Sequence, residues 1–190
     1  MKKTILNLTT VFFMVIAVIG VSSCSKTEDA VEDITVPVPL SINTNTEIEI
    51  PFAVSTEEVV FPDMPLNLDV EAKIKEKFPA LSINNLKSAK LSSFSIDFLS
   101  SSNADSIKLN KVLSAKLLIK APDLSDKEIA TVENNTSETS LNFTPLADVE
   151  LMEYLKSSNH SLYLKVKGTE AAATQMKVRV NSAFTIQVGL

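Results

Sequence analysis

The segment QMKVRVNSAFTIQVGL, residues 175–190, carries the pattern that decides the fold. Apolar residues fall on its even positions, and polar residues fall mostly on its odd positions. Successive side chains of a β-strand point to opposite faces, so a period of two predicts a long strand with one buried face. The apolar positions of this segment are Met176, Val178, Val180, Phe184, Ile186 and Val188.

The same alternation recurs in three segments nearer the N-terminus. They are TEIEIPFAV at residues 46–54, VLSAKLLIKA at 112–121 and SLYLKVK at 161–167. Shorter strands are predicted at residues 129–133 and 140–143. Pro51 lies inside the first segment and cannot donate a ladder hydrogen bond, which predicts an edge strand there.

The segment LKSAKLSSFSIDFL, residues 86–99, changes phase in its middle. Ala89 and Leu91 are apolar at odd positions, whereas Phe94 and Ile96 are apolar at even positions. One extra residue in a strand produces such a slip, so we predict a β-bulge at Ser92–Ser93.

Two short helices are predicted. TPLADVELMEYLKSS, residues 144–158, has Thr144 as a cap and Pro145 at the first helical position. DVEAKIKEKF, residues 69–78, repeats apolar residues every four positions and pairs Glu71 with Lys75, although its alternation also fits a strand. About seven strands with two helices predict a mainly β fold, an antiparallel β-sandwich (Ig-like or related). A parallel α/β fold would need a helix between most strands.

The N-terminal segment has the order of a secretory signal peptide. Lys2 and Lys3 are followed by an apolar run over residues 5–20 and by the small residues Ser22 and Ser23. The run is shorter than the ~20 residues that a spanning helix needs. We therefore predict a signal peptide at residues 1–23 and no transmembrane helix in the mature protein.

The chain's one cysteine, Cys24, follows this run in the sequence VSSC. VSSC resembles the lipobox of bacterial lipoproteins, with variant residues of a kind seen in Bacteroidota lipoproteins, and the resemblance implies that Cys24 is lipidated. The alternative is an ordinary residue beside a cleavage site. A lone thiol in an exported protein needs an explanation, and lipidation supplies one. One acyl chain anchors a protein only marginally, but the two or more chains of a lipidated cysteine form a stable anchor.

The stretch SKTEDAVED after the cysteine has two readings. Lys26, Glu28 and Asp29 resemble a Bacteroidota surface-export signal, which implies the outer membrane and favours the cell surface over the periplasmic face. A plain solvated linker is the alternative. Residues 24–45 as a whole are polar and Pro-spaced, which predicts a flexible tether ahead of a single domain at residues 46–190.

Charge excludes some classes of partner. The chain has 18 Lys and Arg against 23 Asp and Glu, a net charge of −5, and loss of Lys2 and Lys3 with the signal peptide makes it more acidic. Nucleic-acid phosphates demand a basic stripe, so no nucleic-acid partner is expected. The partners expected are the membrane, through Cys24, and an unidentified envelope protein or extracellular ligand.

Catalytic signals are weak. His160, the chain's one histidine, could in principle serve a Ser–His–Asp arrangement, but no G-x-S-x-G elbow is present and we predict an exposed loop histidine. Glu57–Glu58 and the set Asp148, Glu150 and Glu153 fit structural roles better than acid–base chemistry. We expect no enzyme activity, no cofactor and no metal site.

The sequence signals for sugar binding and for glycosylation are weak. The chain has no Trp on which a sugar could stack, and Tyr154 and Tyr163 lie in predicted packed elements. The triplet DSI resembles the O-glycosylation motif of Bacteroidota exported proteins, with Ser106 as the acceptor; a polar loop is the alternative. The sequence thus predicts a lipid-anchored, non-enzymatic binding or assembly module. A surface lipoprotein that captures glycan, peptide or lipid and an envelope hydrolase are the alternatives, favoured respectively by an apolar pocket and by a concave site around His160.

Overall fold

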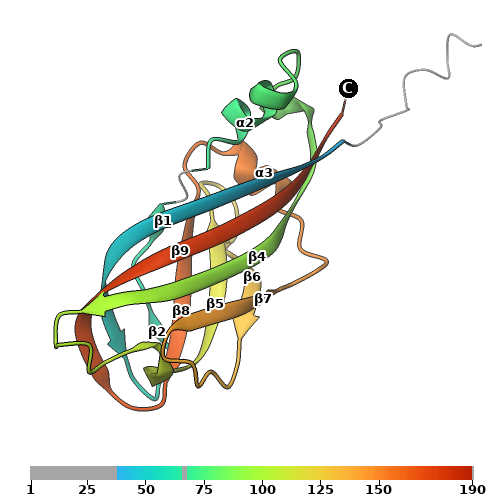
Figure 1. The fold of residues 1–190 in the computed structure, drawn as a ribbon. Coiled ribbons are helices and arrows are strands. Elements are labelled where there is room, and N and C mark those ends of the chain that lie inside the picture. Colours follow the sequence, from blue (N-terminus) through green and yellow to red (C-terminus); the bar gives the residue numbers. More distant parts are fainter. Residues whose placement is uncertain (1–37, 66–67, 190) are drawn as a thin grey trace, which may run out of the picture. The chain divides into compact units, whose positions relative to one another are not determined.

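The computed structural model describes residues 38–65 and 68–189, and Figure 1 shows them as a set of long, crossing strands with a few short helices. The elements in chain order are β1 (Val38–Val54), β2 (Val59–Val60), β3 (Met64–Pro65), α2 (Val70–Lys77), the 3₁₀ turn η1 (Ile83–Asn85), β4 (Leu86–Ser101), the 3₁₀ turn η2 (Leu109–Lys111), β5 (Val112–Lys120), β6 (Lys127–Val132), β7 (Ser140–Pro145), α3 (Met152–Lys156), β8 (Ser161–Gly168) and β9 (Ala172–Val188).

The strands form two layers that β7 joins. Their order is β1-β9-β4-β7-β6-β5-β8-β2, with β3 also paired to β8, and every pairing is antiparallel. The first half of β7 pairs with β4, as at Phe94↔Phe143, and its last residues pair with β6, as at Thr131↔Thr144. In Figure 1, β1, β9 and β4 cross in front of β8, β5 and β6. The predicted antiparallel β-sandwich is confirmed.

Strand β9 is the centre of the front layer. It pairs with β1 without a register shift from Val38↔Val188 to Val54↔Ala172, and it pairs with β4 on its other side. The β4–β9 ladder shifts register between Leu91 and Ser93, which confirms the bulge that the phase slip predicts. It shifts again near each end of β4, and these two shifts have no counterpart in the sequence pattern.

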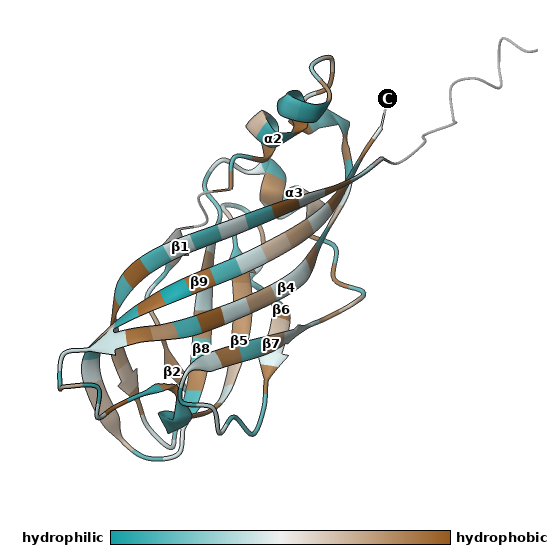
Figure 2. Ribbon diagram, viewed as in Figure 1, coloured by the Kyte–Doolittle hydropathy of each residue, from teal (hydrophilic) through white to brown (hydrophobic). Residues whose placement is uncertain are grey.

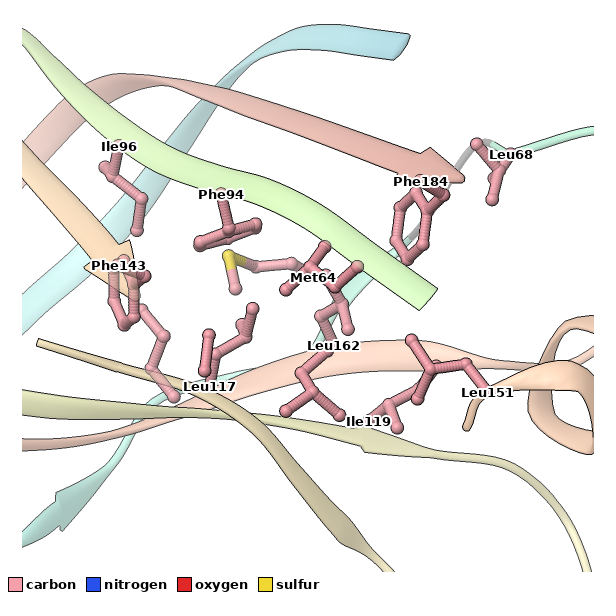
Figure 3. Close-up of a cluster of buried hydrophobic side chains, with 14 of the residues drawn as sticks. Met64, Leu68, Phe94, Ile96, Leu117, Ile119, Phe143, Leu151, Leu162 and Phe184 are labelled. Atoms are coloured by element: carbon pink, nitrogen blue, oxygen red, sulfur yellow. The ribbon is translucent and has the colours of Figure 1, made fainter. Parts of the chain in front are cut away.

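Apolar side chains fill the space between the layers. Phe94 of β4 meets Phe143 of β7 edge to face, with ring centroids 5.2 Å apart and an interplanar angle of 81°. Figure 3 shows Phe94, Ile96 and Phe184 facing Leu117, Ile119 and Leu162 across the interior. Figure 2 shows the hydropathy alternating along the front strands, as a single buried face requires.

The first strand begins earlier than the sequence predicts. The sequence predicts a tether at residues 38–45, but these residues pair with β9, as at Leu40↔Ile186 and Asn43↔Ala183. Inward positions in this stretch include polar Thr44, whose hydroxyl lies 2.7 Å from that of buried Ser182, so the two polar groups satisfy each other. This pairing is why a polar stretch forms a strand here. β1 lies at one end of the strand order, which confirms the edge strand that Pro51 predicts.

The helix predicted at residues 69–78 is confirmed as α2. Val70 and Ile74 are buried, and the Glu71 carboxylate lies 2.6 Å from the Lys75 ammonium as expected. Asp69 caps the helix, because its carboxylate accepts a hydrogen bond of 2.8 Å from the Ala72 N–H.

The second predicted helix starts in the wrong place. Thr144 and Pro145 end strand β7 instead of capping a helix, and α3 covers only Met152–Lys156. The Leu146 N–H bonds to the Ile129 carbonyl, which continues the sheet edge past Pro145. As a result Leu146 is among the most exposed large apolar side chains of residues 38–65 and 68–189.

Candidate functional site

A depression of about 360 Å³ lies at the end of the sandwich that carries α2 and α3. α2 and the residues before it form one wall, η1 contributes Ile83, and the segment between α3 and β8 forms the opposite wall. Its lining combines apolar side chains with four that ionise. The lining residues are Leu68, Asp69, Val70, Glu71, Ile83, Leu155, Lys156, Ser157, Ser158 and His160.

His160 lines this depression and is half-buried, so the prediction of an exposed loop histidine is wrong. Its Nδ1 lies 2.6 Å from the Ser157 carbonyl oxygen. A carbonyl can only accept, so Nδ1 carries a proton and the neutral ring has its lone pair on Nε2. Nε2 is buried and has no hydrogen-bond partner within the described part of the chain.

Both carboxylates of the depression already have structural partners. Asp69 caps α2, as described above. Glu71 binds Lys75 and also accepts a hydrogen bond from the Ile83 N–H, which ties α2 to η1. These two interactions, the Lys75 hydrogen bond first, hold the pKa of Glu71 below its ordinary value.

The hydroxyls of the depression are not arranged for nucleophilic catalysis. The Ser157 hydroxyl accepts a hydrogen bond of 3.4 Å from the Asn159 N–H. Among the residues that the structure describes, no hydrogen bond links His160 to a carboxylate or to a hydroxyl. A Ser–His–acid relay needs both links, so none is preformed among these residues.

The carboxylate of Glu150 is used in the fold. It accepts hydrogen bonds from the Ser88 hydroxyl (2.7 Å) and from the N–H groups of Ala89 (2.6 Å), Leu151 (3.0 Å) and Met152 (3.0 Å). Burial raises the pKa of Glu150, but these four donors outweigh burial and lower it overall. Glu150 therefore joins the start of α3 to β4, which is the structural role that the sequence favours.

The opposite end of the sandwich holds the predicted glycosylation site. Ser106 is exposed in the loop between β4 and η2, so an enzyme could reach its hydroxyl. Asp105 of the same triplet adopts a positive φ of 60°, and its carboxylate accepts a hydrogen bond of 2.6 Å from the Ser101 N–H. A second depression, of about 220 Å³, lies near this loop and is lined by Glu49, residues 100–102, Gln175, Met176 and Lys177.

Several predicted site residues cannot be placed. Cys24, Lys26, Glu28 and Asp29 lie outside the described residues. Within the described ranges, no helix is long and apolar enough to cross a membrane, and no cluster of three His, Cys, Asp or Glu side chains could hold a metal ion.

Sequence reasoning did not identify the partners of two structural carboxylates at this end of the molecule, Asp69 and Glu150. Asp69 stands directly before a run with helical periodicity, which is an ordinary N-cap signal that could have been used. Glu150 gives no comparable signal, because its partners Ser88 and Ala89 are far away in the sequence and meet it only in the fold.

The comparisons with known proteins do not place this chain in a family. No protein-family model and no curated protein matches it. Among solved structures, a turnip yellow mosaic virus chain matches with 12% identity and a TM-score of 0.28 over 80% of this chain and 96% of that one. A chain of the empty head of the same virus matches with 11% identity and a TM-score of 0.27 over 89% of this chain and 92% of that one. A desmodium yellow mottle tymovirus chain matches with 10% identity and a TM-score of 0.26 over 81% of this chain and 89% of that one. TM-scores this low establish neither a shared fold nor a function.

Proposed function

We propose that the protein is a lipid-anchored, non-enzymatic binding or assembly module of the bacterial outer membrane. The proposal is carried by the position of Cys24, which ends an apolar run with a charged start and stands shortly before a folded β domain. An anchor in this position leaves the whole sandwich outside the bilayer. The filled interior and the structural use of Asp69, Glu71 and Glu150 support a binding role over a catalytic one.

The early start of β1 limits how far the domain can stand from its anchor. The tether comprises residues 25–37, because β1 begins at Val38. At ~3.3–3.6 Å per residue, that length of chain spans about 45 Å at most. The domain would thus act within about one domain diameter of the membrane, where neighbouring envelope proteins and surface ligands are found.

Membrane attachment is tested with a matched pair of variants. Cys24→Ala removes the sulfur that would carry the lipid, and Ser23→Ala changes the residue just before it to one that common lipoboxes contain. We expect Cys24→Ala in the soluble fraction and Ser23→Ala in the membrane fraction with the wild-type protein. Mass spectrometry should find a lipid adduct on Cys24. A free Cys24 thiol in the membrane-bound native protein would contradict the proposal.

Capture of a small ligand is the second candidate, and the depression beside His160 favours it. Its volume lies in the range of small-molecule sites, and its walls combine apolar side chains with polar groups that could orient a ligand. The space between the two sheets is filled by side chains, so the site would be this end depression and not a groove inside the sandwich.

Nuclear magnetic resonance can test this second candidate with defined probes. A tripeptide, a monosaccharide and a lysophospholipid are titrated separately, and shifts are followed at Ile83, Leu155 and His160. Ile83→Trp fills the depression and should abolish any shift, whereas Ile107→Val on the other side of the domain should leave it unchanged. Shifts that persist in Ile83→Trp would place binding elsewhere.

A further inference from the structure

The free edge of β1 has an unusual combination of length and sequence. β1 has 17 residues and pairs with β9 along all of them, but no strand within the described ranges pairs with its other side. The opposite end of the strand order is β2, which has only two residues. Native proteins usually shorten or block such edges, because an open edge is a template for a further strand.

The residues along this edge form an approximate palindrome about Asn45. The stretch PLSINTNTEIEIP, residues 39–51, has the same order of polar and apolar residues in both directions. Two antiparallel copies related by a two-fold axis at Asn45 would oppose every residue to its mirror position. The opposed positions are Thr44 with Thr46, Asn43 with Glu47, Ile42 with Ile48, Ser41 with Glu49, Leu40 with Ile50 and Pro39 with Pro51.

The backbone of β1 has the right parity for this pairing. On β9, the Gln175 carbonyl and the Gly189 N–H both form hydrogen bonds on the β4 side. Backbone groups of successive strand residues alternate between the two neighbouring strands. The odd residues of β9 therefore direct their N–H and C=O groups to β4, and the even residues direct theirs to β1. Even residues of β9 lie opposite even residues of β1, as at Ile48↔Val178. The odd residues of β1, with Asn45 at the centre, therefore turn their N–H and C=O groups to the open edge.

We propose that β1 pairs antiparallel with the β1 of a second copy of this chain, with the two-fold axis at Asn45. Asn45, both Asn43–Glu47 pairs and both Ser41–Glu49 pairs would then exchange about ten hydrogen bonds between the copies. Pro39 and Pro51 are odd residues that lack an N–H, so they end the ladder on both sides. The two front layers become one continuous sheet across the dimer.

Two alternative registers are less favourable than the one centred on Asn45. If one copy slides by one residue, backbone N–H and C=O groups that face the open edge lie opposite residues whose backbone groups face β9. The hydrogen bonds between the copies are then lost. A shift of the axis to Glu47 places the two Glu47 carboxylates opposite each other and brings Pro51 inside the ladder. In the Asn45 register Glu47 faces an amide, and its charge is already balanced within its own chain by Arg179 (2.8 Å) and Lys177 (2.9 Å).

The inward face of β1 offers apolar surface to a second copy. Leu40, Ile48 and Ile50 are only partly buried, whereas their neighbours on β9 that point the same way, such as Val178 and Ile186, are fully buried. The proposed pairing places Leu40 against Ile50 and Ile42 against Ile48. Apolar pairs directly opposite each other across two strands stabilise a sheet.

Disulfide cross-linking tests the register directly. Full chains carrying Cys24→Ser, with one cysteine introduced at a time, are oxidised and run on a non-reducing gel. Asn45→Cys should form a covalent dimer, because residues opposed at the axis have Cα atoms about 5.5 Å apart, within disulfide range. Asn43→Cys is the matched control, since its two copies would be about 13 Å apart. The double variant Asn43→Cys/Glu47→Cys should link again.

Charge substitutions at Asn43 test the same contact without oxidation. Asn43 lies opposite Ala183 in its own chain, so a new charge there meets no charged cross-strand neighbour. In the dimer, Asn43→Glu would place a carboxylate opposite Glu47 of the other copy at two positions, and these like charges repel. Asn43→Lys would instead form two opposite-charge pairs with Glu47. The dissociation constants measured by analytical ultracentrifugation in mild detergent should differ by on the order of tenfold. Equal cross-linking at 45 and 43, or equal affinities of the two charge variants, would overturn the proposal.

Discussion

Replacement of Glu150 tests whether one carboxylate fastens α3 to the front sheet. The side chain accepts four hydrogen bonds, two from the first turn of α3 and two from Ser88 and Ala89 of β4. Glu150→Ala removes the acceptor and leaves these donors to find water. Glu150→Gln keeps the shape but turns an amide NH₂ group toward N–H donors.

The magnitude follows from the number of donors and from their exposure. A hydrogen bond to a charged group contributes roughly 1.5–3 kcal/mol when its loss leaves a buried group unsatisfied. Glu150 is half-buried, so water can reach some of the donors and the loss per bond is smaller. We expect Glu150→Ala to lower the free energy of unfolding by about 3 kcal/mol, which is a fall in Tm of about 6–12 °C for a domain of this size.

The assay is urea unfolding followed by circular dichroism between pH 3 and pH 7. The pKa of Glu150 is lowered in the folded state, so the carboxylate's contribution is complete above its unfolded value near 4.5 and is lost as the pH falls through the folded pKa. The difference in free energy of unfolding between wild type and Glu150→Gln should stay constant from pH 7 to about pH 5. It should become smaller below about pH 4.5.

Glu153→Gln is the matched control for this experiment. Glu153 lies in the first turn of α3, but its exposed side chain contacts only Lys156, at 3.5 Å, among the salt bridges of the described residues. Exposed pairs of this kind contribute ~0–1 kcal/mol, so the control should unfold close to wild type. If Glu150→Ala and Glu153→Gln lost the same small amount of stability, the reasoning about Glu150 would be refuted.

Three further predictions concern the core and the sheet. Phe94→Ala should cost about 3–5 kcal/mol in urea unfolding, because it empties a fully buried site against Phe143. Burial and the hydrogen bond to Asp126 raise the pKa of Tyr163 to about 12. The stability linked to this hydroxyl should therefore be complete below about pH 10 and decline toward pH 12. Ultraviolet titration should show this ionisation step, and Tyr163→Phe should lack it. Deletion of Ser92 should abolish soluble expression, because it exchanges the buried and exposed faces of the following β4 residues, whereas Ser92→Ala should remain folded.

Strict alternation made the largest part of the sheet predictable. The run ending in Phe184, Ile186 and Val188 has one consistent phase, and it forms β9, the strand on which both β1 and β4 pair. The phase slip at Ser92–Ser93 was equally informative, because an extra residue is the simplest way for one strand to keep both of its halves facing the core.

The errors arose where long-range partners override local preference. Thr144 and Pro145 carry a genuine helix-start signal, but the pairing of Thr144 with Thr131 places them in β7. The real start of α3 depends on the Glu150 carboxylate, which β4 positions from a distant part of the chain. Capping residues read from a local window cannot report such contacts.

The candidate site shows the same limit. The sequence places His160 in a polar stretch before a strand, and a polar stretch predicts exposure. The fold brings it to a depression that α2 and η1 line together with His160. The sequence therefore singled out His160 but not its surroundings, and those surroundings leave its Nε2 without a partner in the described ranges.

The threonines of β1 bear on both the predicted tether and the proposed dimer. Thr44 and Thr46 occupy inward positions where an ordinary edge strand would carry apolar side chains. The polarity of Thr44 is one reason why residues 38–45 predict a linker. Among the described residues of one chain, Thr44 has a polar partner on this face, the hydroxyl of Ser182, and no hydrogen bond is seen from the Thr46 hydroxyl. Pairing at Asn45 would set Thr46 of each copy beside Thr44 of the other, so each threonine would gain a hydroxyl neighbour. Thr46→Val should then weaken dimerisation while leaving monomer stability within about 0.5 kcal/mol.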